Sequence, residues 1–377
     1  MSQSNENGLF LVGVPGLEGA LEAEARRLGL AGVRRVAGGV EAAGGLEEAA
    51  RANRQMRCAV RVLMRVAEFR AMHLAQLDKR ARKVDWRAWL RPDVPVRVEA
   101  TCRRSKIYVN KAAVQRASGA LEAAGVPVAK DAEIVVKVRI DDDLCTISLD
   151  TTGEALHRRG HKTFVGKAPL RETMAAAFLW EMGFDGSQAV VDPMCGSGTV
   201  PLEAAEIAVG LVPGRSRSFA WQGLVGGEAL SAAGDVPVAE AVQAYLKDKD
   251  GAGRFLGFDR NDGAIRGARE NAERAGVATL CRFERQAISD LQPPEGVAQG
   301  IVLVNPPYGG RIGDRKMLFG LYGALGAVLA ERFAGWSVGI VTSDGGLAKA
   351  TGLGLEPFGP IDHSGTKVTL WKSRLVG

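Results

Sequence analysis

The sequence predicts an α/β protein with a Rossmann-like, mostly parallel sheet in its second half and an α+β region before it. Three observations lead to this prediction. From residue 189 onward, short apolar runs alternate with helix-like stretches, which is the order of a doubly wound sheet. One of those runs leads through a glycine-rich turn directly into a helix. The first 69 residues instead show the βαββαβ order of a ferredoxin-like fold.

Length and composition limit the class of protein. The chain has 377 residues, enough for two or three domains, and its 46% hydrophobic and 24% charged residues are typical of a globular protein. The apolar run at 9–14 is broken by Gly13 and followed by Pro15, so we expect neither a signal peptide nor a membrane span. The five cysteines form no CxxC pair. This argues against a disulfide framework or a metal site and predicts a cytoplasmic location.

Basic residues are concentrated in one segment of the chain. The formal net charge is +6, but residues 51–170 hold 25 Lys and Arg against 13 Asp and Glu, while the remainder holds 24 against 30. A basic segment beside an acidic remainder is typical of a protein that binds a polyanion such as RNA. A solvated, arginine-rich surface would give the same counts. On charge alone both interpretations remain open.

The first 150 residues predict two successive α+β regions, because runs of alternating polarity mark strands and apolar residues at intervals of three and four mark helices. In the first region we expect a strand at 9–14, a helix at 17–28, a hairpin at 33–36 and 39–43, a helix at 46–58 and a strand at 59–69. In the second we expect helices at 71–81 and 85–90, a strand at 94–101, a helix at 111–124, and strands at 134–140 and 144–149.

A polar, basic bridge at 151–169 leads into the third region. There we expect a helix at 170–182, strands at 189–191, 254–258, 280–285, 300–304 and 337–342, and helices at 200–209, 262–275 and 316–332. A last pair of strands, 355–358 and 367–371, can form a terminal hairpin. An insertion at 213–252 has Gly and Pro at both ends and one expected helix, 238–247.

The strongest local signal is the segment Asp192-Pro193-Met194-Cys195-Gly196-Ser197-Gly198-Thr199, which joins an expected strand to an expected helix. Gly196 and Gly198 lack a Cβ where the chain turns tightly. The unpaired N–H groups at the start of the helix can bind a carboxylate, and Asp192 can orient the loop or meet an ammonium group. These features fit S-adenosylmethionine, a sulfonium amino acid. We interpret Cys195 as a small packing residue, not a nucleophile.

Asp259 ends the next expected strand, at the same edge of the predicted sheet. A carboxylate in this place can accept hydrogen bonds from ribose hydroxyls. It can also cap the helix that begins near Asn261 and Asp262, and the two roles are compatible.

The catalytic candidate is Asn305-Pro306-Pro307-Tyr308, 113 residues after Asp192 and at the end of another apolar run. The lone pair of an exocyclic amine is delocalised into its ring, and methyl transfer needs that pair free. The Asn305 side-chain oxygen and the Pro306 carbonyl can each accept one N–H, while the prolines remove backbone donors. Tyr308 offers a face on which a flipped base can stack. The motif therefore predicts methyl transfer to an NH2 group, with a plain Pro-Pro turn as the alternative.

His157 and His161 are four residues apart, which could suggest a metal pair. The two arginines between them, and the absence of the Glu of an HExxH motif, make a basic loop near nucleic acid or cofactor the preferred interpretation.

Together these motifs resemble the THUMP-containing RNA guanine-N2 methyltransferases, in particular the amino-terminal half of the bacterial large-subunit rRNA enzymes. The likeness covers essentially the whole chain and rests on four segments: Asp192–Thr199, Asn305–Gly309, Leu156–Lys162 and Ala168–Thr173. It implies a ferredoxin-like domain at 1–69, a THUMP RNA-binding domain at 70–155 and a class I methyltransferase domain at 156–377, with a seven-stranded sheet that ends in an antiparallel hairpin.

The resemblance also implies the site. The expected cofactor is S-adenosylmethionine, the expected partner is RNA, with rRNA preferred, and we expect a monomer without metal or membrane. The cofactor-binding residues would be Asp192, Pro193, Cys195, Gly196, Ser197, Gly198, Thr199, Asp259, Asp290 and Asn305. The catalytic residues would be Asn305, Pro306, Pro307 and Tyr308. The RNA-binding residues would be Arg103, Arg104, Lys106, Lys111, Arg158 and Arg159.

One position departs from the family pattern. The family often has Asp after the third strand of the sheet, where it contacts the cofactor adenine, and Ala287 stands there in this chain. Asp290 or a backbone amide then has to make that contact, or the cofactor affinity is lower.

Three alternatives to an RNA guanine-N2 methyltransferase remain open. A DNA adenine-N6 enzyme and a protein glutamine methyltransferase also act on NH2 groups, and a noncatalytic RNA-binding module is a further alternative. The basic, THUMP-like segment favours RNA as the substrate, and the intact Asn305 motif favours an enzyme. Neither identifies the modified nucleotide, and neither separates rRNA from tRNA.

Overall fold

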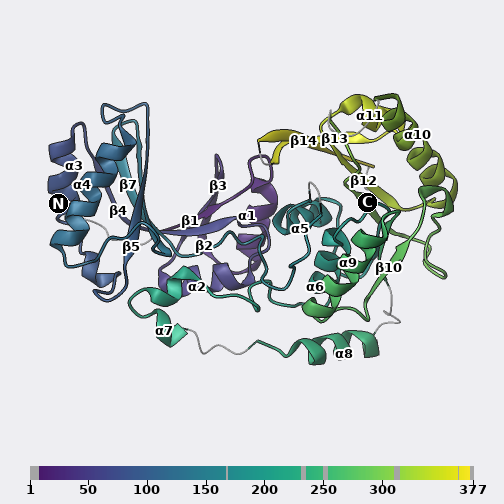
Figure 1. Ribbon diagram of the computed structural model, residues 1–377, viewed down its shortest axis with the longest axis horizontal. Helices are drawn as coiled ribbons and strands as arrows, with labels where there is room; N and C mark the ends of the chain where they lie inside the picture. Colours follow the sequence, from purple (N-terminus) through teal and green to yellow (C-terminus); the bar gives the residue numbers. More distant parts are fainter. Residues whose placement is uncertain are drawn as a thin grey trace. The chain divides into compact units, whose positions relative to one another are not determined.

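The computed structural model describes residues 8–166, 169–230, 235–248, 254–309, 315–363 and 365–373, and the chain divides into two compact units (Figure 1). Unit 1 consists of Met1–Gly13, Leu21–Leu156 and Arg217–Gly234. Unit 2 consists of Val14–Ala20, His157–Ser216 and Asp235–Gly377. Ala168, part of a segment on which the family resemblance rests, lies outside the described residues. So do 231–234 and 249–253 of the expected insertion.

A seven-stranded sheet in the order β2-β3-β1-β4-β7-β6-β5 forms the centre of unit 1. Its strands are β1 (Gly8–Val12), β2 (Ala31–Val36), β3 (Gly39–Ala43), β4 (Arg61–Arg70), β5 (Val96–Arg103), β6 (Ile134–Asp141) and β7 (Leu144–Asp150). Alternation sets which face is buried: Leu9 and Leu11 of β1 have no exposed surface. The core of the unit therefore lies on the side of the sheet that these residues face.

β4 joins the two expected α+β regions. It pairs with β1 along its first half and with β7 along most of its length, both antiparallel. The ferredoxin-like and THUMP-like parts therefore share one continuous sheet. The expected boundary between residues 69 and 70 falls at the end of this shared strand.

The helices of unit 1 cover this sheet. They are α1 (Glu18–Arg27), whose first three residues belong to unit 2, α2 (Leu46–Gln55), α3 (Leu74–Ala81), η1 (Trp86–Ala88), α4 (Asn110–Ala123), η2 (Ala220–Gly223) and α7 (Gly227–Leu230). Figure 1 shows α3 and α4 side by side over one face. Residues 217–230 return to unit 1, where the Trp221 N–H donates to the Thr151 carbonyl at 2.9 Å. Such a return of the chain has no local signal in the sequence.

Unit 2 contains the second seven-stranded sheet, in the order β10-β9-β8-β11-β12-β14-β13. Its strands are β8 (Ala189–Asp192), β9 (Phe255–Asp259), β10 (Cys281–Arg285), β11 (Gly300–Val304), β12 (Ser337–Thr342), β13 (Glu356–His363) and β14 (Thr366–Lys372). The first five are parallel, while β14 is antiparallel to both β12 and β13. Every residue of β8 and β11 is buried, as expected of central parallel strands.

Helices cover both faces of the second sheet. The helices of unit 2 are α5 (Glu172–Glu181), α6 (Thr199–Ala208), α8 (Val238–Asp248), α9 (Asp262–Ala275), η3 (Ile288–Asp290), α10 (Arg315–Arg332) and α11 (Gly345–Ala350). Figure 1 shows α5, α6 and α9 on one face and α10 and α11 on the other. Val191, Val302 and Ile340 of the sheet pack with Tyr322 and Leu325 of α10 in one apolar cluster. This arrangement confirms the predicted fold class.

Among the described residues, no helix combines the length and the apolar character needed to cross a membrane.

Candidate active site

The predicted motifs begin at the carboxyl ends of three neighbouring parallel strands of the second sheet. β8 lies between β9 and β11, and Val191 of β8 is opposite Val302 of β11. The chain continues from β8 to β9 on one side and returns to β11 on the other, so the strand order reverses here. Open α/β sheets bind their ligands at such a point. Asp192, Asp259 and Asn305 stand at the carboxyl ends of these strands, and the structure brings all three together.

The glycine-rich loop depends on two residues with left-handed backbone. Gly196 has φ +53° and Gly198, which precedes α6, has φ +81°. A Cβ on Gly198 would lie 3.0 Å from the Phe283 ring and 3.1 Å from Ala268, so a side chain there would require these neighbours to shift. A Cβ on Gly196 would meet nothing within 4 Å. Gly196 therefore faces open space, and its contact with a cofactor stays a prediction.

Asp259 fixes the loop from the neighbouring strand. Its Oδ2 accepts the Gly196 N–H at 3.1 Å and its Oδ1 accepts the Asn261 N–H at 2.9 Å. The capping role considered for Asp259 is instead performed by Asn261, whose side chain accepts from Gly263 and Ala264 at the start of α9. Carboxylate oxygens have further lone pairs, so contact with ribose hydroxyls stays a prediction.

Asp192 is a buried carboxyl group beside this loop. It is 4% exposed, and its Oδ1 accepts the Met194 N–H at 3.1 Å. Burial raises the pKa of Asp192 to about 8; the Met194 N–H opposes this shift and the nearby Asp259 carboxylate adds to it. A cation placed against this carboxyl would stabilise its ionised form.

Cys195 is a packing residue, as expected. Its side chain is buried, and burial raises the pKa of its thiol well above the usual value, with Asp192 and Asp259 adding to the shift. A thiol held in its neutral form is a poor nucleophile.

The catalytic candidate Asn305 has an unusual environment. Its side-chain oxygen is buried and has no hydrogen-bond partner in the part of the chain that the structure describes. The following loop is held by α10, because the Tyr322 hydroxyl lies 3.4 Å from the Pro307 carbonyl oxygen that accepts its hydrogen bond. Tyr308 is partly buried against the apolar cluster, and its hydroxyl lies 3.4 Å from His363 Nδ1. The loop is thus fixed on two sides, while none of these contacts pairs the Asn305 oxygen.

Two residues that the sequence analysis did not single out fix the loop from the other side. The Lys162 Nζ lies 2.7 Å from Glu172 Oε1 and 2.6 Å from Thr199 Oγ1 at the start of α6. Lys162 is 5% exposed, so this ammonium is enclosed by its partners. The signal available in the sequence was its place in the basic segment that follows Leu156.

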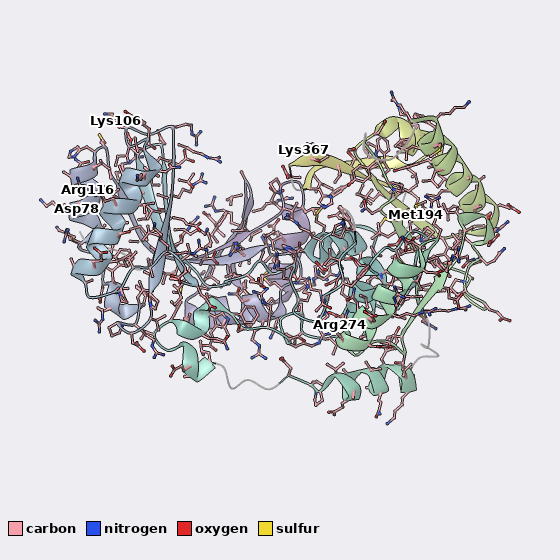
Figure 2. All side chains as sticks on the ribbon, in the orientation of Figure 1. Asp78, Lys106, Arg116, Met194, Arg274 and Lys367 are labelled. Carbon is pink, nitrogen blue, oxygen red and sulfur yellow. The ribbon has the colours of Figure 1, made fainter. Side chains whose placement is uncertain are left out.

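Asn271 of α9 is the second such residue. It has no exposed surface and donates to the carbonyls of Ser197 at 3.1 Å and Phe164 at 3.0 Å, while its oxygen accepts the Phe164 N–H at 3.2 Å. Arg274, labelled in Figure 2, donates to the same oxygen at 2.6 Å. A polar residue at a buried position of an amphipathic helix is the signal in the sequence that could have identified this contact.

The histidines of the basic segment form no metal pair. His161 Nε2 lies 2.7 Å from Glu206 Oε1, which Arg215 also contacts at 3.0 Å. Burial lowers the pKa of His157 to about 4. In the part of the chain that the structure describes, no group of three His, Cys, Asp or Glu residues could hold a metal ion.

The predicted RNA-binding residues fall into two groups. Arg103, Arg104, Lys106 and Lys111 are exposed in unit 1, and Figure 2 labels Lys106. Arg158 is also exposed. Arg159 corrects the prediction: it is 2% exposed and its Nε lies 3.0 Å from Glu203 Oε1, so RNA cannot reach its guanidinium.

Asp290 is placed on the surface in η3. Its Oδ1 accepts from Ser289 at 3.1 Å, and its carbonyl accepts from Gln286 at 2.6 Å. Ala287 precedes this turn and is exposed. A contact between Asp290 and the cofactor adenine stays a prediction.

Comparison with known families places the fold and site in one class of protein. Residues 159–354 match the RMKL-like methyltransferase domain, residues 9–63 the RlmL ferredoxin-like domain and residues 71–150 the THUMP domain. The first match covers just over half of the chain. The chain belongs to the RMKL-like methyltransferase family, and the predicted resemblance is confirmed. The boundaries at 69/70 and 155/156 stay predictions.

Individual relatives agree with this assignment. The chain is 37% identical over 360 residues to the ribosomal RNA large subunit methyltransferase K/L of Syntrophotalea carbinolica, covering 91% of this chain and 50% of that relative. It is 29% identical over 380 residues to a putative RNA methyltransferase of Synechocystis, covering 96% and 94%. The chain thus spans about half the length of the first curated relatives it matches.

A solved structure shares the whole fold. SMU.472, a putative methyltransferase crystallised with SAH, superposes with a TM-score of 0.79 at 25% identity, covering 98% of this chain and 99% of that one.

Proposed function

We propose that this chain transfers a methyl group from S-adenosylmethionine to the exocyclic N2 of a guanosine in large-subunit ribosomal RNA. One observation carries the proposal: the Asn305 side-chain oxygen is buried at a strand end, and no described residue forms a hydrogen bond with it. A buried, unpaired acceptor costs about 1–3 kcal/mol of stability. The fact that the protein keeps an acceptor at this cost in stability favours a hydrogen-bond donor on the substrate, and an NH2 group is such a donor.

The residues of the glycine-rich loop fit the methyl donor. Gly196 opens toward free space, and α6 begins at the end of this loop with N–H groups that can receive a carboxylate. The Asp192 carboxyl is suited to an ammonium group, and the Asp259 carboxylate to ribose hydroxyls. When bound, this cofactor supplies an activated methyl group on a positively charged sulfur.

The Asn305 motif would prepare the amine for transfer. In the free nucleobase the amine lone pair is shared with the ring, so the nitrogen is flat and weakly nucleophilic. Asn305 Oδ1 accepts one N–H, and the Pro306 carbonyl is proposed to accept the other, which holds the nitrogen in a pyramidal form. Positioning and oriented dipoles then supply most of the rate enhancement. The motif needs no strong base, because a methylated ammonium is acidic and gives its proton to water.

The preference for RNA has two supports. The match to a THUMP domain covers residues 71–150, and the exposed side chains of Arg103, Lys106 and Lys111 lie in that range. The names of the relatives describe methyltransferases of large-subunit ribosomal RNA. The choice of guanine N2 over other amines rests on the resemblance of the motifs to the guanine-N2 family.

Nucleoside mass spectrometry tests the proposal. Purified 23S rRNA and tRNA from a strain that lacks the gene would be compared with those of the parent strain. We expect N2-methylguanosine to fall in 23S rRNA and to be restored by the wild-type gene but not by the Asn305→Ala variant. A loss confined to tRNA would identify a tRNA enzyme, and a loss of N6-methyladenine from DNA would identify a DNA enzyme. Unchanged modification in every nucleic acid would contradict enzymatic action on RNA or DNA.

A further inference from the structure

The terminal hairpin places a histidine against the catalytic loop. His363 is the last residue of β13, and its Nδ1 lies 3.4 Å from the Tyr308 hydroxyl. β13 is anchored to the sheet through β14, with Ile361, two residues earlier, paired with Val368. Ile361 and Val368 have no exposed surface, so the strand that carries His363 is firmly packed.

Stacking on a base requires only the ring of Tyr308, so the role of its hydroxyl has to be explained separately. One side of Tyr308 packs on the apolar cluster beneath it. A contact at the far end of the ring adds a second point of attachment, and two points define the plane in which the ring lies. The Tyr322 contact to Pro307 is made to the backbone of the loop and not to the Tyr308 side chain.

We propose that His363 is a positioning residue: its neutral Nδ1 accepts the Tyr308 hydroxyl hydrogen and holds the ring where the target base stacks. The proposal rests on the proposed function, since it assigns Tyr308 a role toward a nucleobase. His363 itself contacts no reacting atom in this scheme.

The surroundings of His363 favour the neutral imidazole. Burial is the largest effect that lowers its pKa below 6.5, and the Arg171 guanidinium lowers it further. A hydrogen bond to the Pro169 backbone and the charge of Asp362 act in the opposite direction. Asp362 is itself paired with Lys367 at 3.0 Å, which weakens its effect on the imidazole. Once protonated, both ring nitrogens are donors and the Tyr308 hydroxyl loses its acceptor.

A double-mutant cycle with Tyr308→Phe and His363→Phe measures the coupling. Each single change should lower the single-turnover rate of methyl transfer about five-fold, the worth of one neutral hydrogen bond, and leave cofactor affinity unchanged. The double variant should be no slower than either single variant. His363→Asn keeps an acceptor and should restore most of the rate. Multiplicative losses in the double variant would overturn the proposal.

The pH profile distinguishes positioning from a structural role. In wild type the contribution of His363 should be complete near neutral pH and decline as pH falls through its lowered pKa. In Tyr308→Phe and His363→Asn that decline should be absent. The same acid decline in all three proteins would count against the proposal.

A readout without substrate keeps this inference separate from the proposed function. Nitrogen NMR of the imidazoles, with His363 assigned from the His363→Asn spectrum, gives the pKa of His363 directly. Tyr308→Phe should raise that pKa, because the lost donor had favoured the neutral ring, while the resonances of the other three histidines should not move. An unchanged pKa refutes the contact. If the wild type methylates no RNA, the proposed function is wrong, but the pKa shift still tests the hydrogen bond between Tyr308 and His363.

Discussion

Replacing Asn305 by alanine should separate catalysis from folding. The buried oxygen has no partner among the residues that the structure describes, so its removal ends a desolvation cost of about 1–3 kcal/mol. The small space left by the side chain costs a comparable amount. The two effects offset each other, and the free energy of unfolding should change by no more than about 1 kcal/mol. Turnover should nevertheless fall by about 10²–10³, the loss expected when one oriented dipole is removed from a reacting centre.

Asn271→Ala is the matched control. Asn271 is also a buried asparagine, but its side chain makes hydrogen bonds to Phe164 and Ser197. Its removal leaves those backbone groups unpaired, so we expect this variant to lose about 1–3 kcal/mol of stability for each unpaired group. Chemical denaturation measures the stabilities of both variants, and single-turnover transfer to unmodified rRNA measures the rates. Wild-type transfer by Asn305→Ala, or a loss of stability equal to that of Asn271→Ala, would refute the reasoning.

Three further predictions follow from the same geometry. Gly196→Ala should weaken S-adenosylmethionine binding by calorimetry and, because its φ of +53° is left-handed, should also cost about 1–2 kcal/mol of stability; Gly198→Ala adds a close contact with Phe283 to the same backbone strain and should lower the melting temperature further; equal affinity of wild type and Gly196→Ala would contradict the loop assignment. Folding raises the pKa of Asp192 from 3.8 to about 8, so the free energy of unfolding should decrease as pH rises through this interval. Denaturation curves of Asp192→Asn should not show this decrease. Arg158→Ala should weaken RNA binding and reduce its salt dependence, while Arg159→Ala should cost about 3–5 kcal/mol of stability by breaking its buried ion pair with Glu203; the reverse pattern in filter binding and melting would be inconsistent with the burial of Arg159.

The strands at the centre of unit 2 could be predicted closely, and there is a physical reason. Central parallel strands are buried on both faces, so 189–191 and 300–304 read as unbroken apolar runs and match β8 and β11. β13 was expected at 355–358 but extends over Glu356–His363. Most of its residues are exposed or half-buried and its pairing is interrupted between Phe358 and Ile361, so it carries no clean alternation.

Features set by distant contacts could not be predicted. The pairing of β4 with β7 joins residues more than 70 positions apart, and nothing local marks it. The burial of Arg159 depends on Glu203, 44 residues later, although both neighbours of Arg159 in the chain are exposed. The short helices α7 and α11 have four and six residues, too few to show a period. The motif residues could be placed from sequence because strand ends meet at one edge, whereas Lys162, Asn271 and His363 reach the site from other elements.

Isotope transfer in a purified reaction tests the central claim most directly. Wild-type protein, unmodified 23S rRNA and S-adenosylmethionine with a deuterated methyl group would be combined, and the digested RNA analysed by mass spectrometry. We predict that the label appears in N2-methylguanosine and that Asn305→Ala reduces it by about 10²–10³ with cofactor binding intact. Label in another nucleoside, or none at all in the presence of bound cofactor, would contradict the assignment of Asn305 to the guanine amine.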